Sequence, residues 1–407
     1  MPSKKAKISQ YKLNALLELT QLINTNVPIK ILLNHFSAIL QDLLKIGNIL
    51  IYHHSYNWNV VLRKGISLSE VRKISFEKQI KPYREITHLS FLNEKKENLD
   101  KFDFIIPVLH NNKPLAYVLI GDIDEEMSGI SPSIKHLQFI QTLANIIMVA
   151  IENKILFKNT IEREKLRKEL EIARDVQRYL IPEKEKLAKL QHDLIIKGFY
   201  KPHSEIGGDY YDVIPINEEG YYFCIGDVSG KGIPAAILMA NFQANFRALL
   251  NFSKAKSLKT IISKLNSIVL NLTKGNMFIT FFIAKYDKKK RSVEYINAGH
   301  NSPFYYDSKK DIVSCLVEGT TGLGMTSECI KINYGVIKDV PKKSILLLYT
   351  DGLIEYTSDE NIIFDAEYIK DTIRREKELN KIMYWLEYYI ETKKVFFDDI
   401  SILGIQF

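Results

Sequence analysis

The chain has 407 residues, of which 46% are apolar and 26% charged, and this composition is typical of globular proteins with room for two separate cores. It contains no uninterrupted apolar run of about 18 residues, and no apolar stretch follows its basic start, so the sequence predicts no membrane span and no signal peptide and favours a cytoplasmic location. The net charge of +8 is spread without a basic stripe interleaved with aromatic residues, which argues against nucleic-acid binding.

The first part of the chain alternates helical and strand patterns. After a basic tail at residues 1–10, apolar residues recur at helical spacing up to residue 43 and predict two helices. The segment 48–65 predicts two strands around a polar turn, and 102–123 predicts a hairpin around Asn111-Asn112, residues that tolerate the positive φ of a tight turn. A long helix is expected next, beginning near residue 131.

This layout of helices, strands, hairpin and long helix over residues 11–152 resembles a GAF domain, a module that senses small molecules or proteins. The resemblance implies an α/β regulatory domain, although no single motif carries it. The asparagine-lysine-phenylalanine-aspartate-glutamate signature of cyclic-nucleotide-binding GAF domains is missing, and no cysteine precedes Cys224 to attach a bilin. A ligand sensor and a purely structural dimerisation module both remain open.

A connector is expected at residues 153–184, where the sequence has alternating charges and no glycine or proline before Pro182. Its apolar residues follow steps of four and three, which is typical of a short coiled coil and favours a homodimer. An amphipathic helix lying on its own domain is the alternative. The seam consists of Leu166, Leu170, Ala173, Val176 and Leu180.

Residues 190–407 contain many short apolar runs typical of strands, such as GYYFCIGDV and SILLLYTDG. The segments 233–252 and 257–272 have helical patterns. Because the strands and helices do not alternate strictly, we expect an α+β domain in which two stacked sheets are flanked by helices.

Aspartates stand where several of these apolar runs meet a turn. A single carboxylate at such a place is costly unless it is paired or bound to a cation, so four sites of this kind in one domain indicate a metal centre. The candidate ligands are Asp209, Asp227, Asp351 and the first residue of the pair Asp398-Asp399.

Oxygen ligands without histidine or cysteine suit Mg²⁺ or Mn²⁺. The three cysteines, Cys224, Cys315 and Cys329, are too widely spaced for a zinc site and are expected to be reduced thiols. Two such ions a few ångströms apart could activate water for in-line attack on a phosphoryl group. The acidic set therefore predicts hydrolysis of a phosphate ester.

The stretch GDVSGKG at residues 226–232 invites a nucleotide-binding interpretation because it combines glycines with a lysine. A phosphate-binding loop needs four residues between its first glycine and the Gly-Lys pair, whereas three intervene here. Gly230 and Gly232 instead permit a sharp strand-to-helix turn that leaves the Val228 carbonyl free to bind metal. Lys231 is expected to be a surface residue or to approach the phosphate.

Several motifs occur in the order of a known family: ELEIARDVQRYLIPEK, KPHSEIGGDYYDV, GDVSGKGIPAAILMA, INAGHNSPFYY, LLLYTDGLIEYT and FFDDISILGI. From Glu169 to Phe407 the chain resembles the SpoIIE/RsbU branch of the metal-dependent PPM-type serine/threonine protein phosphatases. The resemblance implies an αββα sandwich that binds two Mn²⁺ or Mg²⁺ ions and attacks phosphate with a bridging hydroxide.

Carried over residue by residue, the resemblance implies that Asp209 and Asp227 bind the two-metal centre with help from the Val228 carbonyl. Asp351 and Asp398 would complete the ligand set, and Asp399 would lie behind them. The role of Asp212 is left open. His300 is expected to be a hydrogen-bonded structural group rather than the general acid.

The sequence thus predicts a cytoplasmic phosphatase for phosphoserine or phosphothreonine, regulated by the GAF-like domain. The family resemblance implies a phosphorylated STAS-type anti-sigma-factor antagonist as the protein substrate. Two alternatives come from other classes of protein. A catalytically inactive partner-binding module would keep the fold without the reaction, and a nucleotide cyclase would use the turn GGDYY at residues 207–211.

Overall fold

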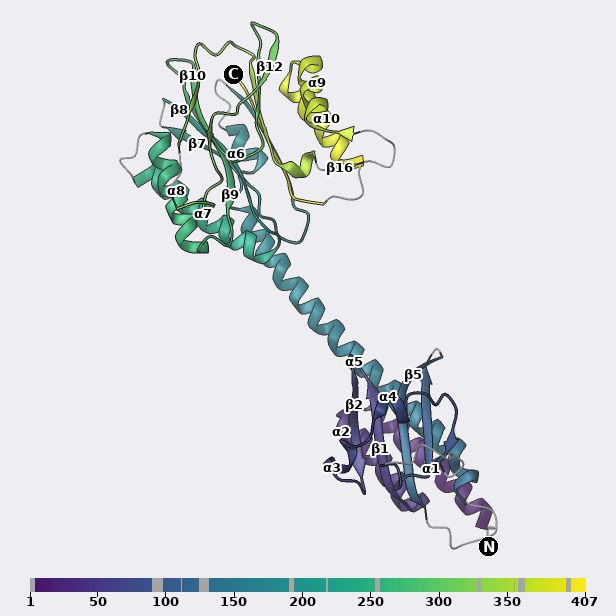
Figure 1. Cartoon of the computed structure of the whole chain (residues 1–407). Helices are drawn as coiled ribbons and strands as arrows, with labels where there is room; N and C mark the ends of the chain where they lie inside the picture. Colours follow the sequence, from purple (N-terminus) through teal and green to yellow (C-terminus); the bar gives the residue numbers. More distant parts are fainter. Residues whose placement is uncertain are drawn as a thin grey trace. The chain divides into compact units, whose positions relative to one another are not determined.

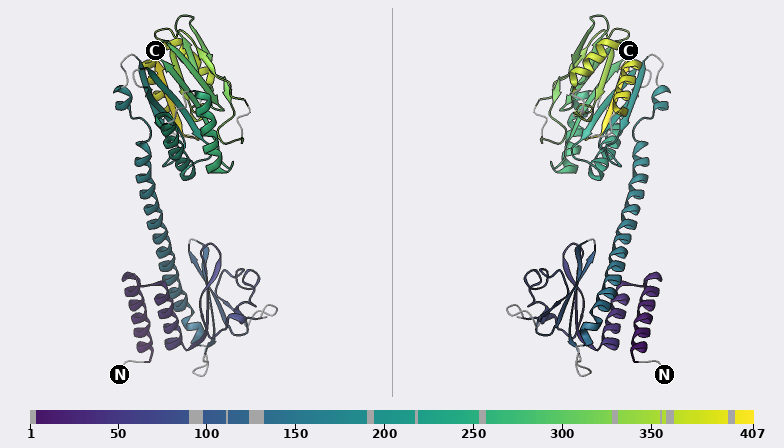
Figure 2. Two further views of the ribbon diagram at one scale, coloured as in Figure 1. Left: turned by 90° about the vertical axis from the view of Figure 1, so that its left-hand side faces the viewer. Right: turned by 90° about the vertical axis from the view of Figure 1, so that its right-hand side faces the viewer.

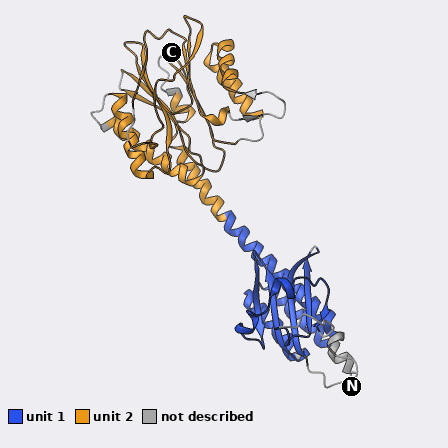
Figure 3. Cartoon of the chain, in the orientation of Figure 1, with its two compact units in different colours: residues 1–164 blue, residues 165–407 orange. Residues whose placement is uncertain are grey.

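The computed structural model describes residues 4–89, 98–110, 112–123, 132–189, 194–216, 219–252, 257–327, 331–354, 356–357, 363–392 and 397–407. The chain forms two compact units, residues 1–164 and 165–407, which are coloured separately in Figure 3. Each unit has hydrophobic clusters of its own. The boundary falls inside one continuous helix, α5, within the segment expected to be the connector.

Unit 1 contains one antiparallel sheet with the strand order β2-β1-β5-β4-β3. The turn between β4 and β5 has the positive φ expected at Asn112, whereas Asn111 lies outside the described residues. The helices of this unit are α1 (Lys4–Asn24), α2 (Ile29–Ala38) with the π-helical turn η1 (Ile39–Leu43), α3 (Leu68–Val71), α4 (Phe76–Gln79) and the start of α5 (Pro132–Arg178). Because α1 begins at Lys4, it includes most of the tail predicted at residues 1–10. The strands are β1 (Ile46–His54), β2 (Trp58–Lys64), β3 (Thr87–His88), β4 (Phe104–His110) and β5 (Lys113–Ile123).

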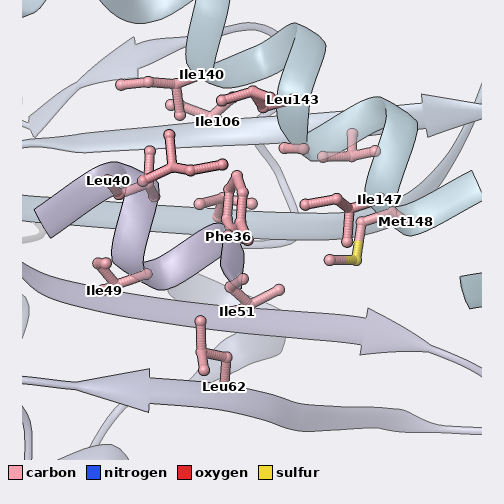
Figure 4. Close-up of a cluster of buried hydrophobic side chains, with 14 of the residues drawn as sticks. Phe36, Leu40, Ile49, Ile51, Leu62, Ile106, Ile140, Leu143, Ile147 and Met148 are labelled. Carbon is pink, nitrogen blue, oxygen red and sulfur yellow. The ribbon is translucent and has the colours of Figure 1, made fainter. Parts of the chain in front are cut away.

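The two faces of this sheet are covered differently. Figure 4 shows Phe36 and Leu40 of the α2–η1 segment packed between the sheet residues Ile49 and Ile106 and the α5 side chains. The opposite face carries a second cluster beneath α3 and α4, in which the rings of Trp58, Phe76 and Tyr117 contact one another. The predicted layout of helices, strands, hairpin and long helix is present.

The helix α5 runs for 47 residues from Pro132 to Arg178 and ends before Pro182. Among the described helices, one segment at 136–178 is long and apolar enough to cross a membrane by length and composition, and 33% of its most apolar window is buried. A core helix of a globular unit passes the same test, and Ile140, Leu143 and Ile147 of α5 pack in the core of unit 1.

Unit 2 contains two large sheets, one with the order β13-β10-β9-β8-β7 and β14 paired to β10, the other with the order β12-β11-β15-β18-β6. Its helices after α5 are α6 (Lys184–Lys189), α7 (Ile233–Phe252), α8 (Leu258–Thr273), the 3-10 turn η3 (Asp351–Leu353), α9 (Ala366–Glu376) and α10 (Leu379–Thr392). Its strands are β6 (Ile195–Lys201), β7 (Tyr210–Ile216), β8 (Gly220–Val228), β9 (Ile279–Asp287), β10 (Ser292–Ala298), β11 (Phe304–Asp307), β12 (Ile312–Cys315), β13 (Gly319–Thr320), β14 (Gly335–Ile337), β15 (Ile345–Tyr349), β16 (Tyr356–Thr357), β17 (Ile363–Phe364) and β18 (Ile400–Gln406).

The two sheets pack face to face in unit 2, with α7 and α8 on one outer face and α9 and α10 on the other (Figures 1 and 2). Three buried clusters fill the layers: one between the sheets, one under α7 and α8, and one under α9 and α10. The expected αββα sandwich is therefore present. Because both faces of each sheet are covered, central strands such as β15 and β18 are buried at every residue and appear in the sequence as continuous apolar runs.

Candidate functional site

The predicted acidic residues lie at the ends of four strands of the sandwich. Asp209 directly precedes β7, and Asp227 is the penultimate residue of the neighbouring strand β8. Asp351 begins η3, just after β15, and Asp398 precedes β18, which pairs with β15. Two carboxylates thus come from each sheet, at strand ends that the pairing brings together.

Asp209 and Asp227 form the buried centre of this acidic group. Asp209 is 1% exposed, and its Oδ2 accepts a hydrogen bond of 2.8 Å from the Thr350 hydroxyl. Burial raises the pKa of Asp209 well above its usual range, and the charges of Asp227 and Asp399 add to this effect. Burial, followed by the charges of Asp351 and Asp398, raises the pKa of Asp227 to about 7. The four predicted side chains therefore act on one another electrostatically.

Asp399 anchors the loop that leads into Asp209. Its Oδ1 accepts from the His203 N–H at 2.7 Å, and its Oδ2 accepts from the Gly208 N–H at 2.6 Å. The Asp399 N–H in turn donates to Oδ1 of Asp398 at 2.8 Å. The expected position of Asp399 behind Asp398 agrees with these contacts, which join the loop to the start of β18.

The glycine-rich turn after β8 has the backbone that its sequence predicts. Gly230 and Gly232 have φ angles of +89° and +71°, and α7 begins directly afterwards. The Val228 carbonyl oxygen lies 3.2 Å from the point where a Cβ on Gly208 would stand, so the two glycine-containing segments approach closely. A side chain on Gly208 would crowd the carbonyl expected to bind metal.

Lys231 contacts the acidic group directly, which the sequence did not predict. Its ammonium lies 2.8 Å from Oδ2 of Asp398 and also donates to the Phe397 carbonyl oxygen. The lysine therefore supplies a positive charge to Asp398. No short sequence signal could have revealed this pair, because its members belong to the turn after β8 and the segment before β18, far apart in the chain.

His300 is buried and joins the two sheets by hydrogen bonds. Its Nδ1 lies 2.8 Å from the Thr280 hydroxyl, and its Nε2 lies 3.1 Å from the Tyr349 carbonyl oxygen. Burial lowers the pKa of His300 to about 4, so the imidazole is neutral near pH 7. These contacts fit the structural role expected for this residue.

Asp212, whose role the sequence left open, is committed to a different partner. It is fully buried, and the Arg247 guanidinium of α7 donates to both of its oxygens at 2.8 and 2.9 Å. The Tyr210 hydroxyl donates to its Oδ2 at 2.6 Å. Asp212 therefore holds α7 against β7. Each of its two carboxylate oxygens already accepts a hydrogen bond from the Arg247 guanidinium.

The chemistry of the acidic group fits a divalent cation. Buried carboxylates with raised pKa values are stabilised when a cation neutralises their mutual repulsion, and oxygen donors are those that Mg²⁺ and Mn²⁺ prefer. Within the described part of the chain, no three His, Cys, Asp or Glu side chains come close enough to hold an ion by themselves.

Comparison with known proteins identifies relatives of unit 2. The family model for stage II sporulation protein E (SpoIIE) matches residues 217–407. Phosphoserine phosphatase RsbU of Bacillus subtilis (strain 168) is 28% identical over 201 residues, which cover 49% of this chain and 58% of that protein. Phosphoserine phosphatase RsbP of the same organism is 28% identical over 205 residues, 47% of this chain and 46% of that protein.

A solved structure gives the same fold. The SiaA-PP2C domain of Pseudomonas aeruginosa aligns with a TM-score of 0.51 at 20% identity, covering 60% of this chain and 98% of that chain. The chain spans about half the length of the curated relatives that it matches.

Proposed function

We propose that the chain is a metal-dependent protein phosphatase acting on phosphoserine or phosphothreonine. The SpoIIE family model that matches residues 217–407 and the fold shared with a PP2C domain support this proposal. The observation that carries the proposal is the meeting of Asp209, Asp227, Asp351 and Asp398 at neighbouring strand ends. Burial, and then the charges of Asp351 and Asp398, raise the pKa of Asp227. The relatives named phosphoserine phosphatases support the same reaction.

In this proposal, Asp209, Asp227, Asp351, Asp398 and the Val228 carbonyl hold two Mn²⁺ or Mg²⁺ ions. The bound ions would supply an activated water and neutralise charge on the phosphoryl group. Thr350 orients the Asp209 carboxylate through its hydroxyl, and Asp399 fixes the loop before it. Lys231 and a bound ion would compete for the negative charge of Asp398.

We assign the protein substrate to the class of phosphorylated STAS-type anti-sigma-factor antagonists, on the strength of the likeness to RsbU and RsbP. Dephosphorylation would free the antagonist to capture its kinase. The reaction would take place in the cytoplasm. A nucleotide cyclase is disfavoured because the GGDYY turn leads into a two-sheet sandwich rather than a cyclase fold.

Unit 1 is proposed to be a GAF-like regulatory domain, and α5 a helix that pairs with the same helix of a second copy. Leu166 and Val176 of the predicted seam are 54% and 59% exposed in the single chain, which leaves them available for such pairing. If the seam forms the dimer, Leu166→Asp with Leu170→Asp gives a monomer in sedimentation equilibrium, whereas Lys168→Asp leaves the dimer intact.

The function is tested by release of phosphate from a phosphoserine protein with Mn²⁺ or Mg²⁺ added to the full chain. We expect Asp227→Asn to abolish release. The matched control is Asp371→Asn, an exposed residue of α9, which should retain wild-type activity. A folded wild-type protein that binds Mn²⁺ but releases no phosphate from any phosphoserine or phosphothreonine protein would favour the inactive partner-binding module.

A further inference from the structure

We infer that Gln177, the penultimate residue of α5, is a positioning residue for the acidic site, because its side-chain amide clamps the backbone of the loop that carries Asp209. The inference rests on the proposed function, since it names an element that controls the same metal site. It concerns unit 2 alone, where the end of α5 and this loop both lie.

The clamp consists of two hydrogen bonds to a single residue. The Gln177 Nε2 donates to the Gly207 carbonyl oxygen at 2.7 Å, and the Gly207 N–H donates to Gln177 Oε1 at 3.3 Å. Gln177 is only 7% exposed, so water does not replace these bonds easily. Both polar groups of the Gln177 side-chain amide bond to Gly207, and together they fix the position and the orientation of the Gly207 backbone.

The opposite side of the loop is held by the site itself. Asp399 accepts from the His203 and Gly208 amides, and Gly208 is followed directly by Asp209. A Cβ on Gly207 would stand 2.5 Å from Asp399 Oδ2 and 2.4 Å from the Tyr200 hydroxyl, so no other residue fits at this position without displacement. The loop is thus packed between α5 and Asp399, and its buried anchors are the side chains of Gln177 and Asp399.

A second contact between α5 and the same loop provides a natural control. Arg174 Nη1 lies 3.2 Å from Glu205 Oε2, with both side chains more than a third exposed. Ion pairs with this exposure contribute little, because water and salt screen them. If the buried amide positions the loop, removing the Arg174 ion pair should matter far less than removing the amide.

The experiment measures Mn²⁺ binding by calorimetry and amide hydrogen exchange of residues 203–208 in metal-free protein, using the full chain. Gln177→Met keeps the length and apolar contacts of the side chain but removes both hydrogen bonds. We expect it to weaken Mn²⁺ binding at least about tenfold, which is the size of effect that follows when residues supporting metal ligands by hydrogen bonds are removed. Exchange in the loop should become faster. Arg174→Met should bind Mn²⁺ within about twofold of wild type.

Wild-type Mn²⁺ affinity and loop exchange in Gln177→Met would overturn the inference, as would equal losses in Arg174→Met. If Gln177→Met does not fold by circular dichroism, Gln177→Glu replaces it: this variant keeps the acceptor for Gly207 N–H but loses the donor, and the same criteria apply. Neither readout uses phosphate release. A chain that shows the clamp effects but hydrolyses no phosphoprotein would therefore refute the proposed function and leave the role of Gln177 standing.

Discussion

The contact of Lys231 with Asp398 has a testable consequence at the scale of a single residue. A cation that binds Asp398 competes with the Lys231 ammonium, which lies 2.8 Å from Oδ2 and is half exposed. Exposed or half-exposed ion pairs contribute up to about 1 kcal/mol. We expect Lys231→Met to bind Mn²⁺ up to about fivefold more tightly in calorimetric titrations.

The control for this variant is Lys259→Met. Lys259 lies on α8 with its ammonium over the Tyr334 ring, and the substitution removes the same charge as Lys231→Met does. It should leave the Mn²⁺ affinity unchanged. Weaker binding by Lys231→Met would mean that the lysine helps to hold the ion rather than competing with it.

His300 gives a prediction for stability against pH. Its folded pKa of about 4 is below the ordinary value of 6.5, so the unfolded chain binds more protons between these values and stability falls as the pH drops through this range. The contribution lost between pH 7 and pH 5 is about 2 kcal/mol. Urea unfolding at both pH values should show this loss in the wild type and a smaller one in His300→Asn. An equal loss in both proteins would contradict the assignment of a buried neutral imidazole.

The clustering of the acidic residues could be predicted from the sequence, whereas the partners of that cluster could not. Asp227 and Asp351 each end an apolar run, and this local signal marks the end of a buried strand. The contacts of Gln177 with Gly207 and of Lys231 with Asp398 depend on how distant strands pair and on where α5 ends. Nothing near either residue in the sequence records those arrangements. The metal ligands themselves stay a prediction until ions are observed.

At the scale of elements, the docking of α7 on β7 depends on the pair Asp212 and Arg247. Because Asp212 is fully buried, removing its cationic partner leaves an uncompensated charge, which typically costs about 3–5 kcal/mol. We expect Arg247→Met to lower the free energy of unfolding by this amount in urea. Adding Asp212→Asn should restore part of the loss, and no recovery in the double variant would argue against the pair.

The element predictions succeeded where packing on both faces produced unbroken apolar runs, as in β15 and β18. The sequence predicted a long helix from about residue 131 and a helical connector from residue 153. The structure has one helix through that point, since no glycine or proline interrupts residues 133–181. Helix-breaking residues, rather than changes in charge pattern, set the limits of α5.

At the scale of the whole molecule, the two units should differ in what they need in order to fold. Unit 2 contains three hydrophobic clusters, and one of them includes Ile181 and Leu187 from the segment after α5. A fragment of residues 165–407 should therefore fold and bind Mn²⁺ like the full chain. A fragment of residues 194–407 lacks Gln177 and both core residues, and should melt at a lower temperature and bind Mn²⁺ more weakly.

Thermal melting by circular dichroism and calorimetric titration of the two fragments test this division. Equal melting temperatures and affinities for both fragments would mean that the end of α5 adds nothing to unit 2. Failure of the longer fragment to fold would mean that unit 2 depends on residues before 165.

The place of β18 in its sheet also constrains how the protein is made. This strand, the last of its sheet along the chain, is inserted between β15 and β6, and Asp398 and Asp399 lie just before it. During translation the ribosome must release residues 400–406 before that sheet can close. Every described strand of unit 1 is complete by residue 123 and the α5 side chains of its core by residue 151, so this unit can fold earlier. A nascent chain would thus carry a folded first unit for some time before Asp398 could join the other three aspartates.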